Sequence, residues 1–190
     1  MRNLVGALAK RKLNRMIVAS LQLSNIDYYW LTKSKKKWNH KAEKYEDIDE
    51  AKGLFWVNQN GENRTLYYDI TVPLIKNNID MILLSDSKDT PIKDSILKNE
   101  NYIALGELKG GIDPAGADEH WKTAKTALDR IIKGFNSRKI KPSIFYIGAA
   151  IENKMAKEIY TQLNNGYFAN AANLTKESHM SSITDWLIEL

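Results

Sequence analysis

The sequence predicts an α/β protein, a sandwich of the α+β kind in which helices flank a central mixed β-sheet. Short apolar runs of strand length, such as 81–84 and 144–151, alternate with longer segments whose apolar residues recur at helical spacing. Turn residues such as Asn60-Gly61 separate the strand-like runs. Hydrophobic residues make up 43% of the 190 residues, which is enough to bury a core.

The composition narrows the environment in which the protein works. The chain has no cysteine, which excludes a disulfide scaffold and cysteine-ligated zinc and suits a reducing compartment such as the cytoplasm. No apolar run approaches the roughly 20 residues needed to cross a bilayer, so we expect no membrane span. The net charge of +5 favours a polyanionic partner only weakly, and on charge alone a solubilising role is the stronger interpretation.

Residues 1–52 are interpreted as a helical and basic N-terminal segment. Between Leu4 and Leu23, apolar residues recur at helical spacing and most basic residues lie elsewhere, which predicts an amphipathic helix. A basic loop with aromatic neighbours is expected next, at Lys33, Lys35, Lys36, Lys37 and Trp38. A solvated loop explains this run at least as well as a contact with phosphate.

Residues 53–190 are expected to form the core of a single compact domain. Its first part has β-forming residues on both sides of Asn60-Gly61, a pattern typical of a hairpin. A second turn is expected at Asn77-Asn78, followed by a short buried strand at 81–84. A further strand is expected at 102–109, and we expect these last two strands to pair antiparallel.

Two helices and one more strand complete the expected order of elements, ββ(β)αβα. Asp113 and Pro114 predict the start of a helix, because proline lacks the N–H that the first turn leaves unused. A buried strand at 144–151 and a helix from Asn153 to the region of Gly166 come next. The first of these helices has one apolar face that predicts packing on the sheet: Ala117, Trp121, Ala124, Leu128, Ile131 and Phe135.

Three charged residues are predicted to meet at the open end of the antiparallel hairpin. The alternation of a strand sends Glu107 and Lys109 to one face. Pairing the two apolar runs sets Asp80 opposite Glu107. The register that does so joins Ile82 with Leu105 and Leu84 with Ile103.

Two carboxylates beside an ammonium group suit the hydrolysis of a phosphodiester bond. Carboxylate oxygens are ligands that Mg²⁺ prefers, and the cation would activate a water molecule. Lys109 would orient that water and offset charge in the transition state. Glu-Leu-Lys alone carries little weight, because surface ion pairs of this kind are common. Asp69, on an earlier strand, is a weaker candidate for the second carboxylate.

The segments around this predicted site resemble a known family. Residues 107–124 read ELKGGIDPAGADEHWKTA, and shorter matching motifs are YDITVP at 68–73, NID at 78–80 and AANLT at 171–175. Together they resemble the AvaI/BsoBI family of type II restriction endonucleases over most of the chain. Members of that family are longer at the N-terminus, which implies that a helical portion that helps to grip DNA is missing here.

The resemblance implies a restriction-endonuclease-like PD-(D/E)xK core. It also implies a homodimer that uses Mg²⁺ to cut both strands of duplex DNA at a short, partly degenerate palindrome. Asp80, Glu107 and Lys109 match the catalytic triplet, with Asp80 and Glu107 as metal ligands. A functional histidine of the family matches His120, which would position the attacking water or bind the scissile phosphate. Without the resemblance, a helix-start histidine satisfied by Asp118 or solvent would be the commoner case.

Other residues near the site are expected to contact DNA. Asp113 can accept a hydrogen bond from a cytosine N4 amine or cap the following helix, and the two roles are compatible. Lys76 and Lys122 are expected to neutralise DNA phosphates. His40 and His179 are expected at the surface rather than as metal ligands.

Two other functions are compatible with these motifs. The same core serves nucleases that repair DNA or resolve junctions, because a fold does not determine its substrate. A shortened chain is also compatible with an inactive remnant that binds DNA without cutting it. The intact triplet argues against such decay, whereas the short N-terminus argues for it.

Overall fold

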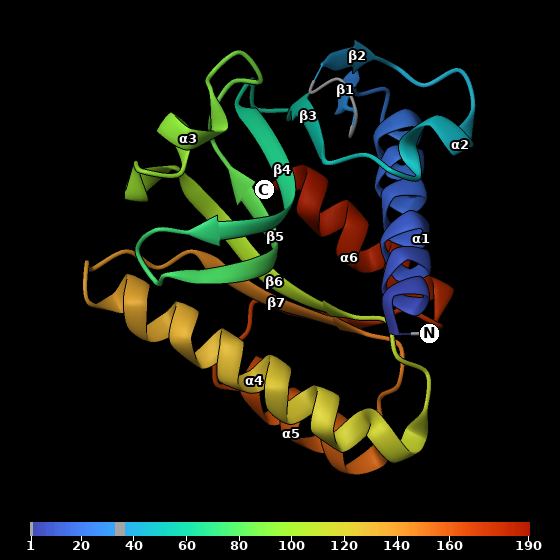
Figure 1. Ribbon diagram of the computed structural model, residues 1–190, viewed down its shortest axis with the longest axis vertical. Coiled ribbons are helices and arrows are strands. Elements are labelled where there is room, and N and C mark those ends of the chain that lie inside the picture. Colours follow the sequence, from blue (N-terminus) through green and yellow to red (C-terminus); the bar gives the residue numbers. More distant parts are fainter. Residues whose placement is uncertain (1, 33–36) are drawn as a thin grey trace.

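A computed structural model of the protein describes residues 2–32 and 37–190 (Figure 1). In this part of the chain eight strands form one sheet, in the order β2-β1-β3-β4-β5-β6-β7-β8. Pairing is antiparallel from β2 to β6 and parallel from β6 to β8, so the sheet is mixed, as predicted. The strands are β1 Tyr28–Leu31, β2 Trp38–His40, β3 Gly53–Val57, β4 Asn63–Val72, β5 Asn77–Leu84, β6 Tyr102–Lys109, β7 Ser143–Gly148 and β8 Asn170–Asn173.

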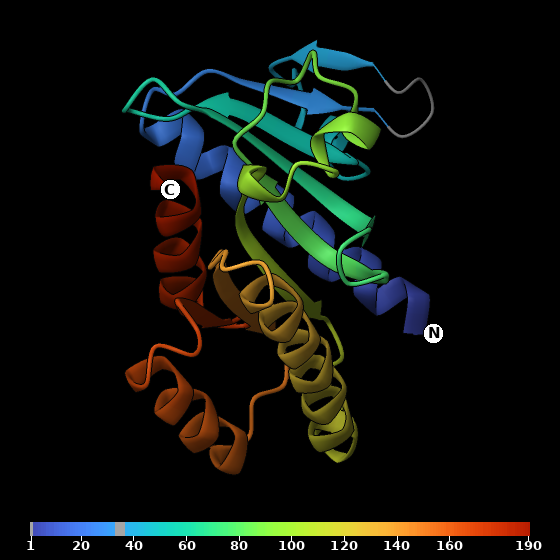
Figure 2. The same cartoon turned by 90° about the vertical axis from the view of Figure 1, so that its left-hand side faces the viewer.

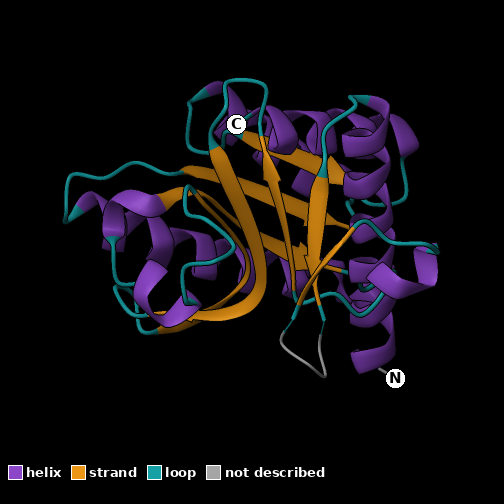
Figure 3. Cartoon of the chain, turned by 90° about the horizontal axis from the view of Figure 1, so that it is seen from above, coloured by secondary structure: helices purple, strands orange, loops and turns teal. Residues whose placement is uncertain are grey.

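Helices cover both faces of the sheet. Of the four longer helices, α1 and α6 pack together on one face of the sheet, and α4 and α5 lie on the other (Figure 2). Seen from above, the strands run between these helices (Figure 3). None of the described helices is both long and apolar enough to span a membrane. The helices are α1 Arg2–Leu23, α2 Tyr45–Ile48, α3 Ile92–Ser95, α4 Pro114–Asn136, α5 Asn153–Asn164 and α6 Glu177–Glu189, with a 3₁₀ turn at Asn99–Asn101.

The alternation of side chains along the central strands divides the core between the two faces. In β5, Met81 and Leu83 belong to the core under α1 and α6, whereas Ile82 and Leu84 belong to the core under α4 and α5. All four side chains are fully buried. Burying a side chain of this size contributes about 1.5–3 kcal/mol, so this short strand stabilises both layers.

The helical faces predicted from periodicity are confirmed. On α1, Leu13, Ile17 and Leu21 are fully buried against the sheet and α6. All six apolar residues expected on one face of the α4 helix are buried in the opposite core. The spacing of apolar residues was therefore enough to predict which face of α1 and of α4 packs on the sheet.

Local details of the central strands differ from the prediction. Asn77 and Asn78 do not form a turn but pair in β5 with Val72 and Thr71. The turn precedes them, at 73–76, and is closed by hydrogen bonds to the Val72 carbonyl. Cross-strand pairing here overrides the turn preference of asparagine.

The register and one strand end also differ. Ile82 pairs with Leu105 as expected, but an irregularity after Leu83 pairs Leu84 with Tyr102 instead of Ile103. The strand expected at 144–151 ends at Gly148.

Strands at both edges of the sheet and the last helix had no counterpart in the sequence-based order. The hairpin β1–β2 adds two strands to one edge of the sheet, and Lys37 and Trp38 of the expected basic loop lie at its second strand. Lys33, Lys35 and Lys36 lie outside the described residues. At the other edge β8 pairs with β7, and α6 then returns across the face that α1 covers.

Candidate active site

The pairing between β5 and β6 stops where the predicted site begins. Met81 pairs with Gly106, and at the residue before it in β5 the side chain of Asp80 accepts a hydrogen bond from the backbone of β6. The Leu108 N–H donates to Asp80 Oδ2 at 2.9 Å. Asp80 is therefore held by the strand that carries the other two residues of the predicted triplet.

Glu107 and Lys109 lie on one face of β6 and contact each other. Lys109 Nζ donates to Glu107 Oε2 at 2.6 Å and to Asp80 Oδ2 at 2.9 Å. The geometric part of the register argument is thus confirmed, because the three side chains form one cluster. Their exposed fractions differ: 4% for the side chain of Glu107, 21% for Lys109 and 29% for Asp80. Glu107 is the buried member, and Asp80 opens the cluster to solvent.

Two glycines allow neighbouring elements to approach β6 around this cluster. A Cβ atom at Gly106 would lie 2.4 Å from the ring of Phe145, which packs across the strand just before Glu107. At Gly110, a Cβ atom would lie 2.7 Å from both the Ala9 Cβ and the Val5 carbonyl oxygen. Glycine at these positions lets β7 and α1 close in on the end of β6 that carries the site.

Burial and charge set the protonation of the cluster. Burial, and secondly the Asp80 carboxylate, raise the pKa of Glu107 to about 7, against the opposing effect of Lys109. Burial alone would lower the pKa of Lys109, but the Glu107 and Asp80 carboxylates outweigh it and raise that pKa. The single ammonium group therefore does not neutralise both carboxylates, and added positive charge would stabilise the ionised form of Glu107.

The donor set fits a hard divalent cation that keeps part of its water shell. No three His, Cys, Asp or Glu side chains converge within the described part of the chain, so a closed cage of zinc type is absent there. Two carboxylates, such as Asp80 and Glu107, are what Mg²⁺ usually takes from a protein, with water and phosphate as its other ligands. The raised pKa of the buried Glu107 points in the same direction.

An open hollow of about 370 Å³ lies in front of the cluster, and we call it the active-site hollow. Sequence reasoning missed the polar residues that α4 contributes to it. Thr123, Thr126 and Arg130 follow the spacing of one helical stripe, but only the orientation of α4 reveals that this stripe faces the site. The full lining is Asn77, Asn78, Asp80, Glu107, Lys109, Thr123, Thr126, Ala127 and Arg130.

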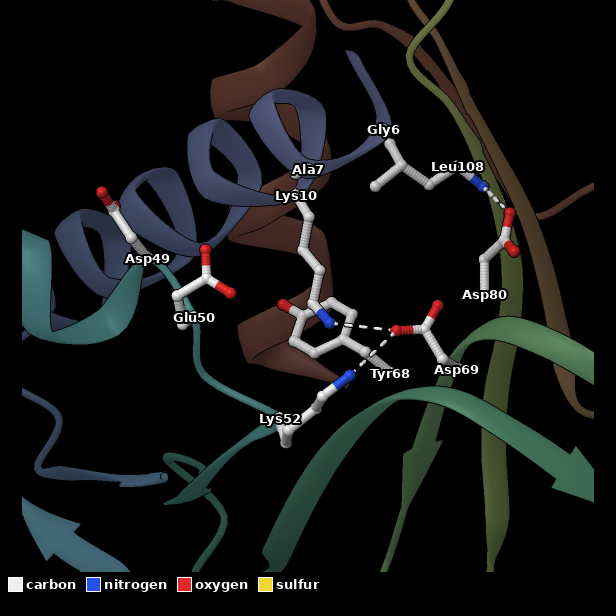
Figure 4. Close-up of a pocket in the computed structure, with 10 residues that line it drawn as sticks. All are labelled: Gly6, Ala7, Lys10, Asp49, Glu50, Lys52, Tyr68, Asp69, Asp80 and Leu108. Carbon is white, nitrogen blue, oxygen red and sulfur yellow. Dashed lines mark hydrogen bonds and ion pairs between the residues drawn. The ribbon is translucent and has the colours of Figure 1, made fainter. Parts of the chain in front are cut away.

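Asp80 also lines a second cavity, of about 310 Å³, next to α1 (Figure 4). We call it the α1-side cavity. Asp69, the weaker candidate from the sequence, lies here with its Oδ2 at 3.2 Å from Lys10 Nζ and 3.5 Å from Lys52 Nζ. Its φ of 57° is in the left-handed region, and the pairing of β4 with β5 skips this residue. The structure therefore joins Asp69 to two lysines rather than to Glu107 and Lys109.

His120 lies outside the residues that line the active-site hollow. It lies in the second turn of α4, not in the first as expected, and its partly exposed ring faces the loop after β6. A Cβ atom at Gly111 would lie only 2.7 Å from His120 Nε2. Asp118, the partner considered for it, forms an ion pair with Lys122 at 2.6 Å instead.

The predicted DNA-contacting residues lie at the surface, and none of them lines the active-site hollow. Asp113 is exposed in the loop after β6, and its carbonyl accepts the Gly116 N–H at the start of α4. Lys122 is exposed on α4, and Lys76 is exposed in the turn before β5 with a φ of 51°.

The other two histidines are surface residues, as expected. His40 contacts Asp27 at 3.2 Å, and the exposed His179 accepts the Asn173 N–H at its Nδ1. Neither ring lines the active-site hollow or the α1-side cavity.

Comparison with known proteins identifies relatives of the chain. It is 50% identical over 192 residues to the type II restriction enzyme AvaI of Nostoc sp. and to that of Anabaena variabilis. It is 48% identical over 195 residues to the type II restriction enzyme BsoBI of Geobacillus stearothermophilus. Each match covers the whole chain, which spans about 60% of the length of these relatives. The family model for restriction endonuclease BsobI matches residues 1–190, and the chain therefore belongs to the BsobI restriction endonuclease family.

Proposed function

We propose that this chain carries the catalytic core of a type II restriction endonuclease that hydrolyses phosphodiester bonds of duplex DNA with Mg²⁺. The observation that carries the proposal is the cluster of Asp80, Glu107 and Lys109 at the wall of an open hollow. Membership in a family whose relatives are named type II restriction enzymes supports the same reaction.

In this proposal Asp80 and Glu107 hold the cation, and Lys109 acts beside them. Bound Mg²⁺ supplies Lewis acidity and lowers the pKa of a water molecule. Glu107 must be ionised to act as a ligand. Because its pKa is raised to about 7, metal binding by Glu107 should depend on pH near neutrality. Lys109 Nζ lies within 2.9 Å of Asp80 and 2.6 Å of Glu107, where it can orient the attacking water and offset charge on the phosphate.

The surrounding residues are proposed to engage DNA. Lys76 and Lys122 are exposed cations suited to phosphate contacts, while the exposed carboxylate of Asp113 suits a cytosine N4 amine. His120 is proposed to act on the attacking water or the scissile phosphate from the edge of the loop after β6. The ring lies against Gly111 and outside the lining of the hollow, so we propose that this loop moves when His120 acts on the substrate.

We further propose that the enzyme is a cytoplasmic homodimer that cuts a short, partly degenerate palindrome. A two-fold symmetric site in DNA presents the same sequence to two identical subunits, so each active site cuts one strand. The mass of the protein in solution, with and without a duplex, tests this stoichiometry.

The reaction itself is tested by incubating the purified protein with bacteriophage DNA and Mg²⁺ and sequencing the fragment ends. We expect discrete fragments whose ends share one short palindrome, and no fragments when Mg²⁺ is chelated. The matched control is Asp69→Asn, which changes a carboxylate near the cluster but outside the active-site hollow. Fragment ends without a common sequence would contradict the assignment as a restriction enzyme.

A further inference from the structure

Arg130 is a cation that lines the active-site hollow and has no ion-pair partner in the described part of the chain. Its side chain extends from α4, whereas the carboxylates come from β5 and β6. Other cations nearby are already engaged. Lys109 contacts Glu107 and Asp80, and Lys122 contacts Asp118.

The position of Arg130 on α4 is set by the packing of the helix. Leu128 and Ile131 are fully buried against the sheet, and these anchors leave Arg130 on the adjoining stripe, exposed to solvent. Thr123 and Thr126 lie on the same stripe and line the same hollow. The hydroxyls of both threonines already donate to carbonyls of their own helix. Among the described residues of this stripe, the Arg130 guanidinium is therefore the donor that remains available in the hollow, and it is also a cation.

The chemistry of the hollow selects the ligand class. A guanidinium group presents N–H donors in a planar fork that matches two oxygens of a phosphate. Asp80 and Glu107 line the same hollow and repel any anion that approaches them directly, so an anion bound by Arg130 belongs on the α4 wall of the hollow. Duplex DNA brings consecutive phosphates along one strand, so a strand held at Asp80 and Glu107 extends its neighbouring phosphates along the walls of the hollow.

We propose that Arg130 binds the DNA phosphate that adjoins the scissile phosphate on the strand being cut. This inference rests on the proposed nuclease function, since it uses the same hollow. The scissile phosphate belongs against the two carboxylates and Lys109 on the β5–β6 wall, whereas Arg130 reaches in from the α4 wall. Arg130 is thus a positioning residue that holds the strand in register with the cluster.

The test measures binding of a short DNA duplex of arbitrary sequence, without divalent cations, as a function of salt. Arg130→Ala should weaken binding and reduce the slope of log affinity against log salt by about one, because one phosphate contact is lost. Arg130→Lys should restore the slope but only part of the affinity, since the fork is lost. The matched control is Arg138→Ala, which removes an exposed arginine beyond the end of α4 that does not line the hollow. Melting temperatures should not change in any of these variants.

Cleavage by saturating protein separates the two phosphates. Arg130→Ala should then cut about tenfold more slowly, because saturation restores binding but not the register of the strand with the cluster. A fall of more than about 100-fold would place Arg130 on the scissile phosphate and overturn the assignment. Unchanged binding by Arg130→Ala, or an equal loss in Arg138→Ala, would overturn the inference while leaving the proposed function intact. Failure of the wild-type protein to bind DNA would overturn both.

Discussion

Asp80 lines both the active-site hollow and the α1-side cavity, and the charges on its two sides are arranged differently. In the α1-side cavity Lys10 and Lys52 share the carboxylate of Asp69 (Figure 4), and two arginines outside the lining pair with two of its other carboxylates, Arg15 with Asp49 and Arg11 with Glu50. In the active-site hollow, Lys109 is shared by two carboxylates and Arg130 has no partner within the described chain.

This difference separates a structural cluster from a site. The ion pairs of the α1-side cavity join α1 and the segment before β3 to the sheet, and Lys10 also lies 4.4 Å above the ring of Tyr68. Charges that are paired within the protein have little left to offer a ligand, and exposed pairs of this kind contribute no more than about 1 kcal/mol each to stability. On the other side of Asp80, Glu107 shares Lys109 with Asp80 and has a raised pKa, and Arg130 has no ion-pair partner among the described residues. This side therefore has charge left for a ligand.

The strongest test of the comparison is Glu107→Gln. The amide keeps the shape of the side chain but cannot hold a cation as a carboxylate does, so cleavage should fall at least about 1000-fold. Single-turnover cleavage of a duplex containing the mapped site measures this loss, and circular dichroism checks the fold. If Glu107→Gln cuts as fast as the wild type, the active-site hollow is misassigned.

His120→Ala should have the next largest effect. If the imidazole acts on the attacking water or the phosphate, its removal should slow cleavage by about 100-fold, the lower end for general acid–base catalysis. The partly exposed ring fills no core position, so the free energy of unfolding should change by no more than about 0.5 kcal/mol. Thermal unfolding and DNA affinity are measured alongside the rate. A marked drop in stability with unchanged cleavage would make His120 a packing residue of the Gly111 loop.

The pH dependence follows from the pKa of Glu107, about 7 against its ordinary 4.5. Below pH 7 a proton competes with the cation, so the cleavage rate at limiting Mg²⁺ should rise about tenfold per pH unit and level off above pH 7. Without metal, the folded carboxyl binds its proton more tightly than the unfolded one. The contribution of this group to stability is therefore greatest below pH 4.5 and is lost as pH rises from 4.5 to about 7. Measuring the cleavage rate and the melting temperature against pH tests both predictions, the rate that rises with pH and the stability that falls with it. In Glu107→Gln the part of each pH dependence that comes from Glu107 should disappear.

The smallest effect is expected on the other side of Asp80. Lys10→Ala removes one ion pair and the contact with Tyr68, which should cost about 1–2 kcal/mol of unfolding free energy. The salt dependence of DNA binding should not change. Lys12→Ala, an exposed lysine on the same helix, is the control for a general loss of charge. A reduced salt slope in Lys10→Ala alone would mean that the α1-side cavity also binds phosphate.

Much of the site was predictable because strand and helix periods are local properties of the sequence. Placing Asp80 beside Glu107 and Lys109 needed only alternation and a register, and the irregularity after Leu83 left it intact because it lies at the other end of the hairpin. Arg130 was not predictable, since its role depends on how α4 is rotated on the sheet. The ion pairs of Asp69 join segments up to 59 residues apart and leave no local signal.

The missed strands have a similar explanation. Residues 170–173 read Asn-Ala-Ala-Asn, without the β-branched or aromatic residues that favour strands, and they become β8 only by pairing with β7. The hairpin β1–β2 is interrupted by a lysine-rich stretch that resembles a solvated loop.

The hydrogen bonds of Asp80 engage only one of its two carboxylate oxygens. Asp80 Oδ2 accepts from both the Leu108 N–H and Lys109 Nζ, so Oδ1 is the oxygen that Asp80 would offer to a bound cation. The carboxylate has also lost its rotamer freedom on folding, and binding does not have to order it again. If Asp80 and Glu107 hold Mg²⁺, as proposed, water and the substrate would supply its remaining ligands.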